Sequence, residues 1–229
     1  KPLRVVNQAK LKAYGSAPNY KYGFEVPRDH AHAMIIDARN GNKKWQEAEA
    51  VELAQLDEYD TFIDVRTDGK ILVGYKKITG HFVYDIKHDG RHKARYVAGG
   101  HLTPIPLESV YSSVVSLLGI RIVTFLAEHN GLELWSTDIG NAYLEAKTKE
   151  KVYIQGGPEF EERTGHTLLI SRALYGMRTS GARWHDRFFD VLKSEGFFPS
   201  KAEPDIWMRA MIDHYEYIAC YVDDLMIAS

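Results

Sequence analysis

Two adjacent acidic residues, Asp223 and Asp224, interrupt an apolar run near the end of the chain and constrain its fold more than any other feature. The run extends over residues 217–222 before the pair and 225–228 after it. Two strands joined by a tight turn would place both carboxylates at the tip of a β-hairpin. Burying carboxylates there is costly unless a cation compensates their charge. Such a pair beside a sheet core indicates a site for a hard metal ion. An ordinary surface turn is the alternative, since Asp favours turns.

A third acid, Asp138, ends the strand expected over residues 132–138. One strand-end carboxylate together with a hairpin acid pair is what a two-metal phosphoryl-transfer site needs, with the two ions about 4 Å apart. The long separation in sequence leaves open whether Asp138 meets the pair in space.

Composition limits the class of protein. The chain has 229 residues, of which 45% are hydrophobic, enough for one large domain with a real core. The formal net charge of −2 is unlike that of most nucleic-acid binders, but the positions of the basic residues matter more than their sum. A single cysteine, Cys220, excludes a disulfide framework or a thiolate zinc site. We find no signal peptide, and no apolar run of about 18 residues that would span a membrane.

A basic hairpin is expected in the first half of the chain. Residues 81–87 and 91–97 alternate like strands, and Asp89-Gly90 between them is a turn signal. With a period of two, Arg91, Lys93 and Arg95 share one face. Three cations on one face suit phosphate binding, and a charged edge strand that resists aggregation is the alternative.

The remaining pattern mixes helices and strands without regular alternation, which predicts the α+β class. Residues 1–44 are polar and are expected to be a linker with at most a short helix. Further helices are expected over residues 45–56, 107–129 and 180–195, the last capped by Ser180. Further strands are expected over residues 61–65, 152–154 and 168–170, with a turn at Asp68-Gly69.

Six motifs in order resemble one family, the copia-type reverse transcriptases of LTR retrotransposons. They cover about residues 20 to 229. The matching positions are Trp45, Ala48, Glu52 and Leu56 with Thr61-Phe62; Lys93 to Ala98; Asp138 to Leu144; Val152 to Ile154 with Gly157 to Phe160; Ala173 to Met177 with Ala182 to Trp184; and Tyr221 to Asp224.

The resemblance implies the fold of a right hand, with fingers and palm at residues 45–229 and a mixed or antiparallel sheet backed by helices. Because the chain ends at Ser229, we expect the thumb of the family to be absent. It implies an RNA-directed DNA polymerase, a nucleotidyltransferase that adds dNTPs to a primer 3′-hydroxyl using two Mg²⁺ ions, or Mn²⁺. The implied partners are an RNA or DNA template with its primer, and the integrase and RNase H regions of the same polyprotein. The implied location is cytoplasmic, in a virus-like particle with access to the nucleus.

The resemblance also implies roles for individual residues. Asp138 and Asp223 would be the principal magnesium ligands, Asp224 a third carboxylate, and the carbonyl of Ile139 an extra ligand. The dNTP site would consist of Lys93, Arg95, Lys87 and Arg91 at the triphosphate, Tyr143 under the sugar, and Gly176, where the backbone approaches the nucleotide. Tyr221 and Val222 would pack beside the primer terminus. Tyr143 and Tyr221 can equally be core residues.

Two departures from the family pattern are visible. The chain has Ala98-Gly99-Gly100-His101 where the family commonly has Ala-Lys-Gly-Phe, so one cation is missing. Glu49 stands where an apolar residue is usual, which predicts a more loosely packed helix. Because the chain ends at Ser229, soon after the acid pair, we expect this fragment alone to be inactive. Two alternatives remain open. One is a non-catalytic remnant that binds nucleic acid or a protein, and the other is a different metal-dependent enzyme such as a nuclease.

Overall fold

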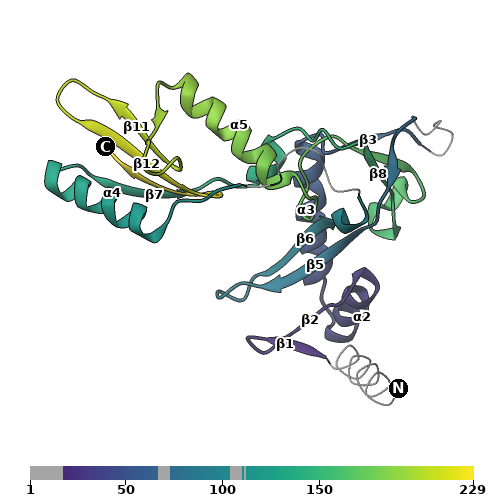
Figure 1. The fold of residues 1–229 in the computed structure, drawn as a ribbon. Coiled ribbons are helices and arrows are strands. Elements are labelled where there is room, and N and C mark those ends of the chain that lie inside the picture. Colours follow the sequence, from purple (N-terminus) through teal and green to yellow (C-terminus); the bar gives the residue numbers. More distant parts are fainter. Residues whose placement is uncertain (1–17, 67–72, 104–109, 111) are drawn as a thin grey trace, which may run out of the picture.

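The apolar run around the acid pair folds into the predicted hairpin, made of β12 (Tyr215–Tyr221) and β13 (Asp224–Ala228). The structure is a computed structural model that describes residues 18–66, 73–103, 110 and 112–229. The hairpin is central in a five-stranded antiparallel sheet of order β10-β11-β12-β13-β7 (Figure 1). The other three strands are β7 (Leu134–Asp138), β10 (Phe198–Pro199) and β11 (Ile206–Ala210).

Two helices cover opposite faces of this five-stranded sheet, as Figure 1 shows. Successive residues of a strand point to opposite faces. From β12, Ile218 and Cys220 therefore pack with α5 (Ser180–Ser194), in a cluster that contains the buried stripe Trp184, Phe188 and Leu192. The alternate positions pack with α4 (Leu117–Asn130) through Val123 and Ala127.

A second group of elements surrounds a separate core (Figure 1). Its four-stranded sheet has the order β3-β9-β8-β4, with β4 and β8 parallel and the other pairs antiparallel. Beside it lies the basic hairpin, formed by β5 and β6, with α3 packed across β6. The element bounds are β3 (Phe62–Asp64), β4 (Lys76–Lys77), β5 (Gly80–Ile86), β6 (His92–Ala98), β8 (Val152–Gln155), β9 (Thr167–Ile170) and α3 (Lys44–Glu58).

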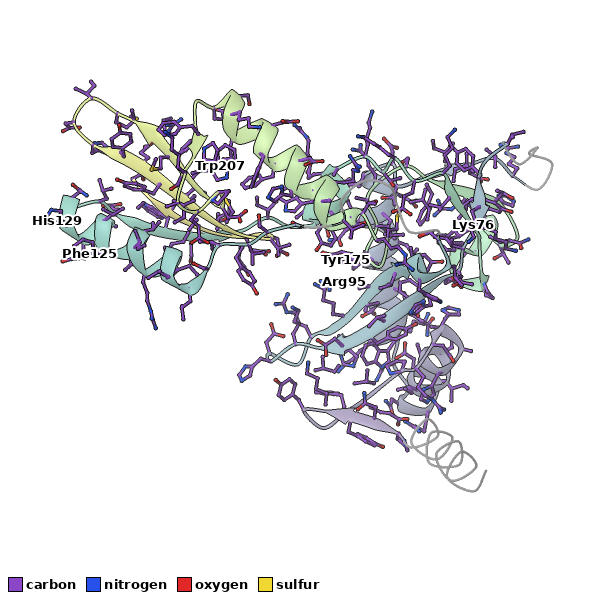
Figure 2. All side chains as sticks on the ribbon, in the orientation of Figure 1. Lys76, Arg95, Phe125, His129, Tyr175 and Trp207 are labelled. Atoms are coloured by element: carbon purple, nitrogen blue, oxygen red, sulfur yellow. The ribbon has the colours of Figure 1, made fainter. Side chains whose placement is uncertain are left out.

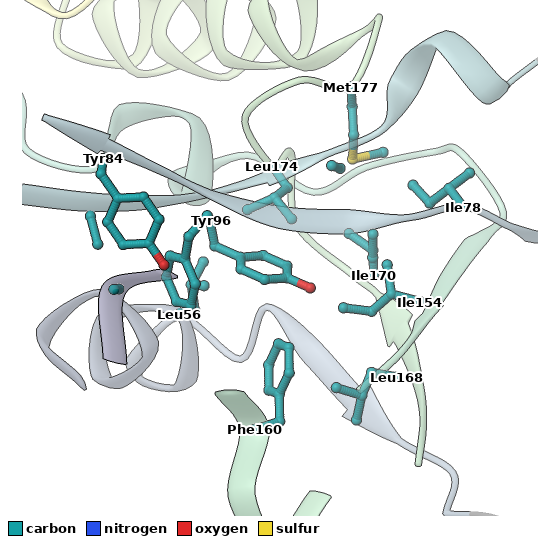
Figure 3. Close-up of a cluster of buried hydrophobic side chains, with 14 of the residues drawn as sticks. Leu56, Ile78, Tyr84, Tyr96, Ile154, Phe160, Leu168, Ile170, Leu174 and Met177 are labelled. Carbon is teal, nitrogen blue, oxygen red and sulfur yellow. The ribbon is translucent and has the colours of Figure 1, made fainter. Parts of the chain in front are cut away.

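Aromatic and branched side chains fill this second core, as Figure 3 shows. The ring of Tyr96 lies edge-on to the rings of Phe82, Phe62 and Phe160, with centroids 5.2, 6.1 and 5.3 Å away. Edge-to-face packing of this kind adds stability beyond the burial of apolar area. Phe160 comes from η3 (Pro158–Arg163), a short 3-10 helix like η1 (Gly100–Leu102) and η2 (Ala142–Glu145).

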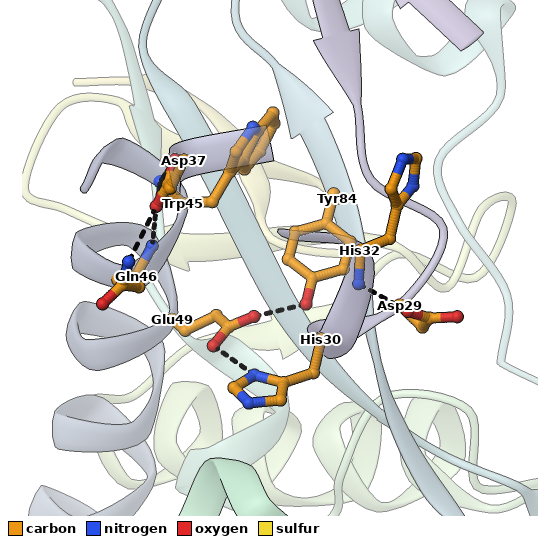
Figure 4. Close-up of polar contacts among 8 residues, drawn as sticks. All are labelled: Asp29, His30, His32, Asp37, Trp45, Gln46, Glu49 and Tyr84. Atoms are coloured by element: carbon orange, nitrogen blue, oxygen red, sulfur yellow. Dashed lines mark hydrogen bonds and ion pairs between the residues drawn. The ribbon is translucent and has the colours of Figure 1, made fainter. Parts of the chain in front are cut away.

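The segment before α3 differs from the expected linker with at most a short helix. Its described part contains a two-stranded hairpin, β1 (Asn19–Lys21) and β2 (Phe24–Val26), and an 11-residue helix, α2 (His30–Asn40). Asp37 is fully buried and accepts hydrogen bonds from the backbone N–H groups of Trp45 and Gln46, so it caps α3 from the preceding helix (Figure 4). The sequence missed this because the stabilising contacts are tertiary.

Glu49 does not loosen α3, contrary to the expectation from its polarity. It is buried, accepts a hydrogen bond from the Tyr84 hydroxyl, and lies 2.8 Å from Nδ1 of His30 (Figure 4). A buried carboxylate with both partners in place is tolerated in a core. Trp45 and Leu56 on the same helix are also buried, so the packing of α3 is tight.

Burial raises the pKa of Glu49 above its ordinary value of 4.5, against the opposing hydrogen bonds from Tyr84 and His30. The folded state therefore binds the proton more tightly than the unfolded state, and the contribution of Glu49 to stability falls as pH rises above about 4.5. We expect Glu49→Gln to gain stability relative to the native chain between about pH 4 and pH 7, measured by urea unfolding. Glu47→Gln, exposed on the same helix, is the control. A difference that stays flat or reverses contradicts this prediction.

Two helix starts also differ from the predictions. In place of a helix over 107–129, α4 begins at Leu117, because Ser116 caps it by accepting from the Gly119 N–H, and Val115 donates to Cys220 on the sheet. Residues 104–109 and 111, and the turn predicted at Asp68-Gly69, lie outside the described residues. Ser180 does not cap α5 but begins it, and its hydroxyl donates to the Leu174 carbonyl.

Candidate active site

The hairpin tip is a two-residue loop, Val222-Asp223, that joins the paired residues Tyr221 and Asp224. Val222 has a φ of 58°, in the left-handed region. Ile139 donates its backbone N–H to the carbonyl of Asp223 over 2.8 Å, which ties the loop to the residue that follows Asp138. This hydrogen bond therefore attaches the loop to the residue that follows β7.

The three acids lie at the same end of the five-stranded sheet. In the register of β13 with β7, Asp224 lies directly opposite Asp138, so the 138–224 pair brings the strand-end acid to the hairpin. Asp138 and Asp223 both line a cleft of about 800 Å³ that continues onto α3 and the basic hairpin. The structure therefore brings together residues that the sequence separates widely.

Within the described residues, no group of three or more His, Cys, Asp or Glu side chains is close enough to hold a metal ion. Mg²⁺ commonly uses one or two protein carboxylates, with substrate phosphates and water completing its shell. Asp138 and Asp223 fit this donor set, because both line the cleft and neither forms an ion pair with a described Lys, Arg or His.

The basic hairpin faces the same cleft. Along β6, Ala94, Tyr96 and Ala98 are buried, so Lys93 and Arg95 alternate onto the other face as predicted. Lys87, Arg91, Lys93 and Arg95 all line the cleft. Burial, with the neighbouring charges of Arg95 and Lys87, lowers the pKa of Lys93, while Glu52 and Asp138 oppose the shift.

Glu52 on α3 is a residue of the cleft that sequence reasoning did not assign to the site. Its Oε1 accepts the backbone N–H of Tyr96 over 2.8 Å, and so caps the outer edge of β6. Burial raises the pKa of Glu52, and the charges of Arg95 and Lys93 oppose this. The available signal was an acid that shares a helical pattern with the apolar residues Trp45, Ala48 and Leu56.

A cation–π contact and a pair of tilted tyrosine rings lie between the basic hairpin and the acids. The guanidinium of Arg95 lies 4.2 Å from the ring centroid of Tyr175, and both residues are labelled in Figure 2. The ring centroids of Tyr175 and Tyr143 are 4.9 Å apart. Burial, and secondarily the Asp223 charge, raises the pKa of Tyr143. Tyr175 was part of a motif in the sequence, but its contact with Arg95 had no signal there.

Gly176 lies where two backbones meet. Its φ is 87°, and a Cβ there would be 2.2 Å from the carbonyl oxygen of Ala98. Ala98 in turn donates its N–H to the Tyr175 carbonyl over 2.7 Å. The close approach visible here is therefore to the basic hairpin, and the predicted approach to a nucleotide stays a prediction.

The predicted site residues fall into two groups. Those that line the cleft are Lys87, Arg91, Lys93, Arg95, Asp138, Ile139 and Asp223. The others lie outside its lining, at or behind the hairpin tip or beside Tyr175, and are Asp224, Tyr143, Gly176, Tyr221 and Val222. The roles of both groups remain predictions.

Comparison with known proteins identifies the class. The family model described as "Reverse transcriptase (RNA-dependent DNA polymerase)" matches residues 69–229, well over half of the chain, and the chain belongs to this family. Its relatives place it with the copia-type retrotransposon reverse transcriptases. It is 26% identical over 165 residues to the retrovirus-related Pol polyprotein from transposon TNT 1-94 of Nicotiana tabacum. It is 29% identical over 183 residues to the transposon Ty1-DR5 Gag-Pol polyprotein of Saccharomyces cerevisiae.

These matches cover 67% and 79% of this chain but only 12% and 10% of the two relatives. The chain thus corresponds to a small part of each polyprotein. Among the described residues, no helix is long and apolar enough to cross a membrane.

Proposed function

We propose that this chain forms the fingers and palm of an RNA-directed DNA polymerase, with the five-stranded sheet as palm and the basic hairpin with α3 as fingers. The single observation that carries the proposal is the cleft, which has Asp138 and Asp223 on one wall and Lys93 and Arg95 on another. Opposite charges across a cleft suit a substrate that brings both phosphates and metal ions.

The proposed reaction is the addition of a dNTP to a primer 3′-hydroxyl, directed by an RNA or DNA template. When bound, two Mg²⁺ ions would activate the hydroxyl and stabilise the leaving pyrophosphate. Asp138 and Asp223 would hold them, with Asp224 and the Ile139 carbonyl assisting. Lys93 and Arg95 would bind the triphosphate, aided by Lys87 and Arg91 at the rim of the cleft.

Base pairing would choose the nucleotide, and the protein would supply positioning and electrostatics. Arg95 is suited to this task because its guanidinium is already oriented by the Tyr175 ring. Tyr221 and Val222 would pack beside the primer end. The integrase and RNase H regions of a longer polyprotein would act in the same particle.

Primer extension tests the proposal. A protein that continues downstream of Ser229 in its natural reading frame is mixed with poly(rA)/oligo(dT), dTTP and Mg²⁺, and incorporation of label is measured. Template-dependent incorporation is expected. If the longer protein binds the primer–template but incorporates nothing, the polymerase proposal fails and a non-catalytic nucleic-acid-binding copy becomes the better account.

Sugar selection is expected to depend on Tyr143. Its ring is half-buried against Tyr175, near the charge of Asp223, where an incoming sugar would pass. Tyr143→Val should raise rNTP incorporation relative to dNTP by about tenfold or more, because the ring no longer clashes with a 2′-hydroxyl. Tyr143→Phe keeps the ring and should keep the selectivity. If the Val variant selects sugars as the native residue does, Tyr143 is only a packing residue.

A further inference from the structure

The loop that carries Asp223 has a backbone conformation that its sequence does not favour. Val222 has a φ of 58°, and a β-branched residue is a genuine outlier in this region because its Cβ substituents crowd the backbone. Asn and Gly occupy this region much more readily. Surrounding contacts must therefore hold the loop in place.

One side chain supplies such a contact. The indole Nε1–H of Trp184 donates to the carbonyl oxygen of Val222 over 2.7 Å. Trp184 is only 5% exposed, and its ring stacks on Phe188 with centroids 5.1 Å apart and an interplanar angle of 18°. The donor is rigid because both rings belong to the buried stripe of α5.

The position of this bond connects α5 to the acids. The Val222 carbonyl belongs to the peptide group that enters Asp223, and the carbonyl of Asp223 accepts from the Ile139 N–H. The planar peptide group between Val222 and Asp223 is thus fixed by the helix α5, and the carbonyl of Asp223 is fixed by Ile139, the residue that follows β7.

We propose that Trp184 is a positioning residue of the metal site, which holds the Val222-Asp223 loop so that Asp223 faces Asp138. This inference rests on the proposed function, because it assumes that both acids bind the catalytic metal ions. Trp184 acts through the loop and touches no reacting atom. Groups that orient metal ligands commonly change metal affinity by about 10- to 100-fold when they are removed.

The chain contains a matched control. Trp207 on β11 is fully buried in the same cluster as Trp184, but its Nε1–H has no hydrogen-bond partner among the described residues. Figure 2 shows it between the sheet and α5. A Trp→Phe change removes ring volume and an N–H group at either position, but only at 184 does it remove a bond to the loop.

The test measures Mn²⁺ binding to the 229-residue chain by electron paramagnetic resonance, with the melting temperature of each variant as a folding check. Trp184→Phe should weaken Mn²⁺ binding about 10-fold or more. Trp207→Phe should leave it close to that of the native chain. Adding Val222→Asn, which favours the left-handed conformation by itself, should restore part of the affinity lost in Trp184→Phe.

Asp223→Asn separates this inference from the proposed function. If Asp223→Asn loses Mn²⁺ binding while Trp184→Phe binds as the native chain does, the positioning role is wrong and the metal site stands. If Asp223→Asn binds Mn²⁺ as the native chain does, the proposed site itself is wrong. Equal loss in Trp184→Phe and Trp207→Phe would show a general loosening of the core, and would also overturn the positioning role.

Discussion

Asp223→Asn should lower primer extension by the longer protein at least about 1,000-fold, since metal coordination supplies several kcal/mol of transition-state stabilisation and each 1.36 kcal/mol is tenfold in rate. Asn has nearly the same shape but lacks the negative charge that holds a divalent cation. Asp223 is half-buried at the cleft wall and forms no ion pair with a described cation. Removing its negative charge should therefore leave no described cation without an ion-pair partner. Incorporation of labelled dTTP on poly(rA)/oligo(dT) measures the effect.

Asp213→Asn is the matched control for this variant. Asp213 is an exposed residue next to His214 in the loop that joins β11 to β12, at the opposite end of β12 from Asp223, so the same chemical change there is far from the cleft. It should extend primers at the native rate. Comparable activity of Asp223→Asn and Asp213→Asn would contradict the assigned site.

The neighbouring acid should matter less. Asp224 faces Asp138 across the strand pair but does not line the cleft, so we expect its contribution to metal binding to be smaller than that of Asp223. The family resemblance implies the same ranking of the two acids, and the ranking stays a prediction.

The parts of this fold that the sequence predicted correctly depend on short-range patterns. The hairpin around the acid pair follows from a continuous apolar run broken only by two acids, because helices cover both faces of its sheet. The basic hairpin follows from a period of two, because only one face of β6 is buried. The stripe of α5 follows from apolar residues one turn apart. The meeting of Asp138 with Asp224 needed the family resemblance, since no local pattern specifies which strand pairs with β13.

The parts that the sequence did not predict depend on single long-range contacts. The segment before α3 folds because Asp37 caps α3 and His30 reaches Glu49, and neither contact has a local signature. Glu49 was expected to weaken packing because an unpartnered buried acid is costly, but the Tyr84 hydroxyl donates to it. The stack of Arg95 on Tyr175 likewise joins residues from separate motifs.

Gly176→Ala should destabilise the chain by about 2–5 kcal/mol, through two causes that add. At a φ of 87°, an L-residue costs about 1–2 kcal/mol relative to Gly. The new Cβ would also lie 2.2 Å from the Ala98 carbonyl oxygen, a contact with backbone that can be relieved only by moving β6, and overpacking of this kind costs about 1–3 kcal/mol. Urea unfolding of the native and variant chains measures the sum.

Gly196→Ala isolates the first cause. Gly196 has a similar φ of 83°, but a Cβ there would meet only the Arg209 side chain, at 3.8 Å, so it should lose the conformational part alone. The difference between the two variants is then the cost of separating residue 176 from β6. Because β6 carries Lys93 and Arg95, that separation should also weaken dNTP binding, which Gly196→Ala should leave unchanged. If the two Ala variants are equally stable, the close contact between Gly176 and Ala98 does not fix the position of β6.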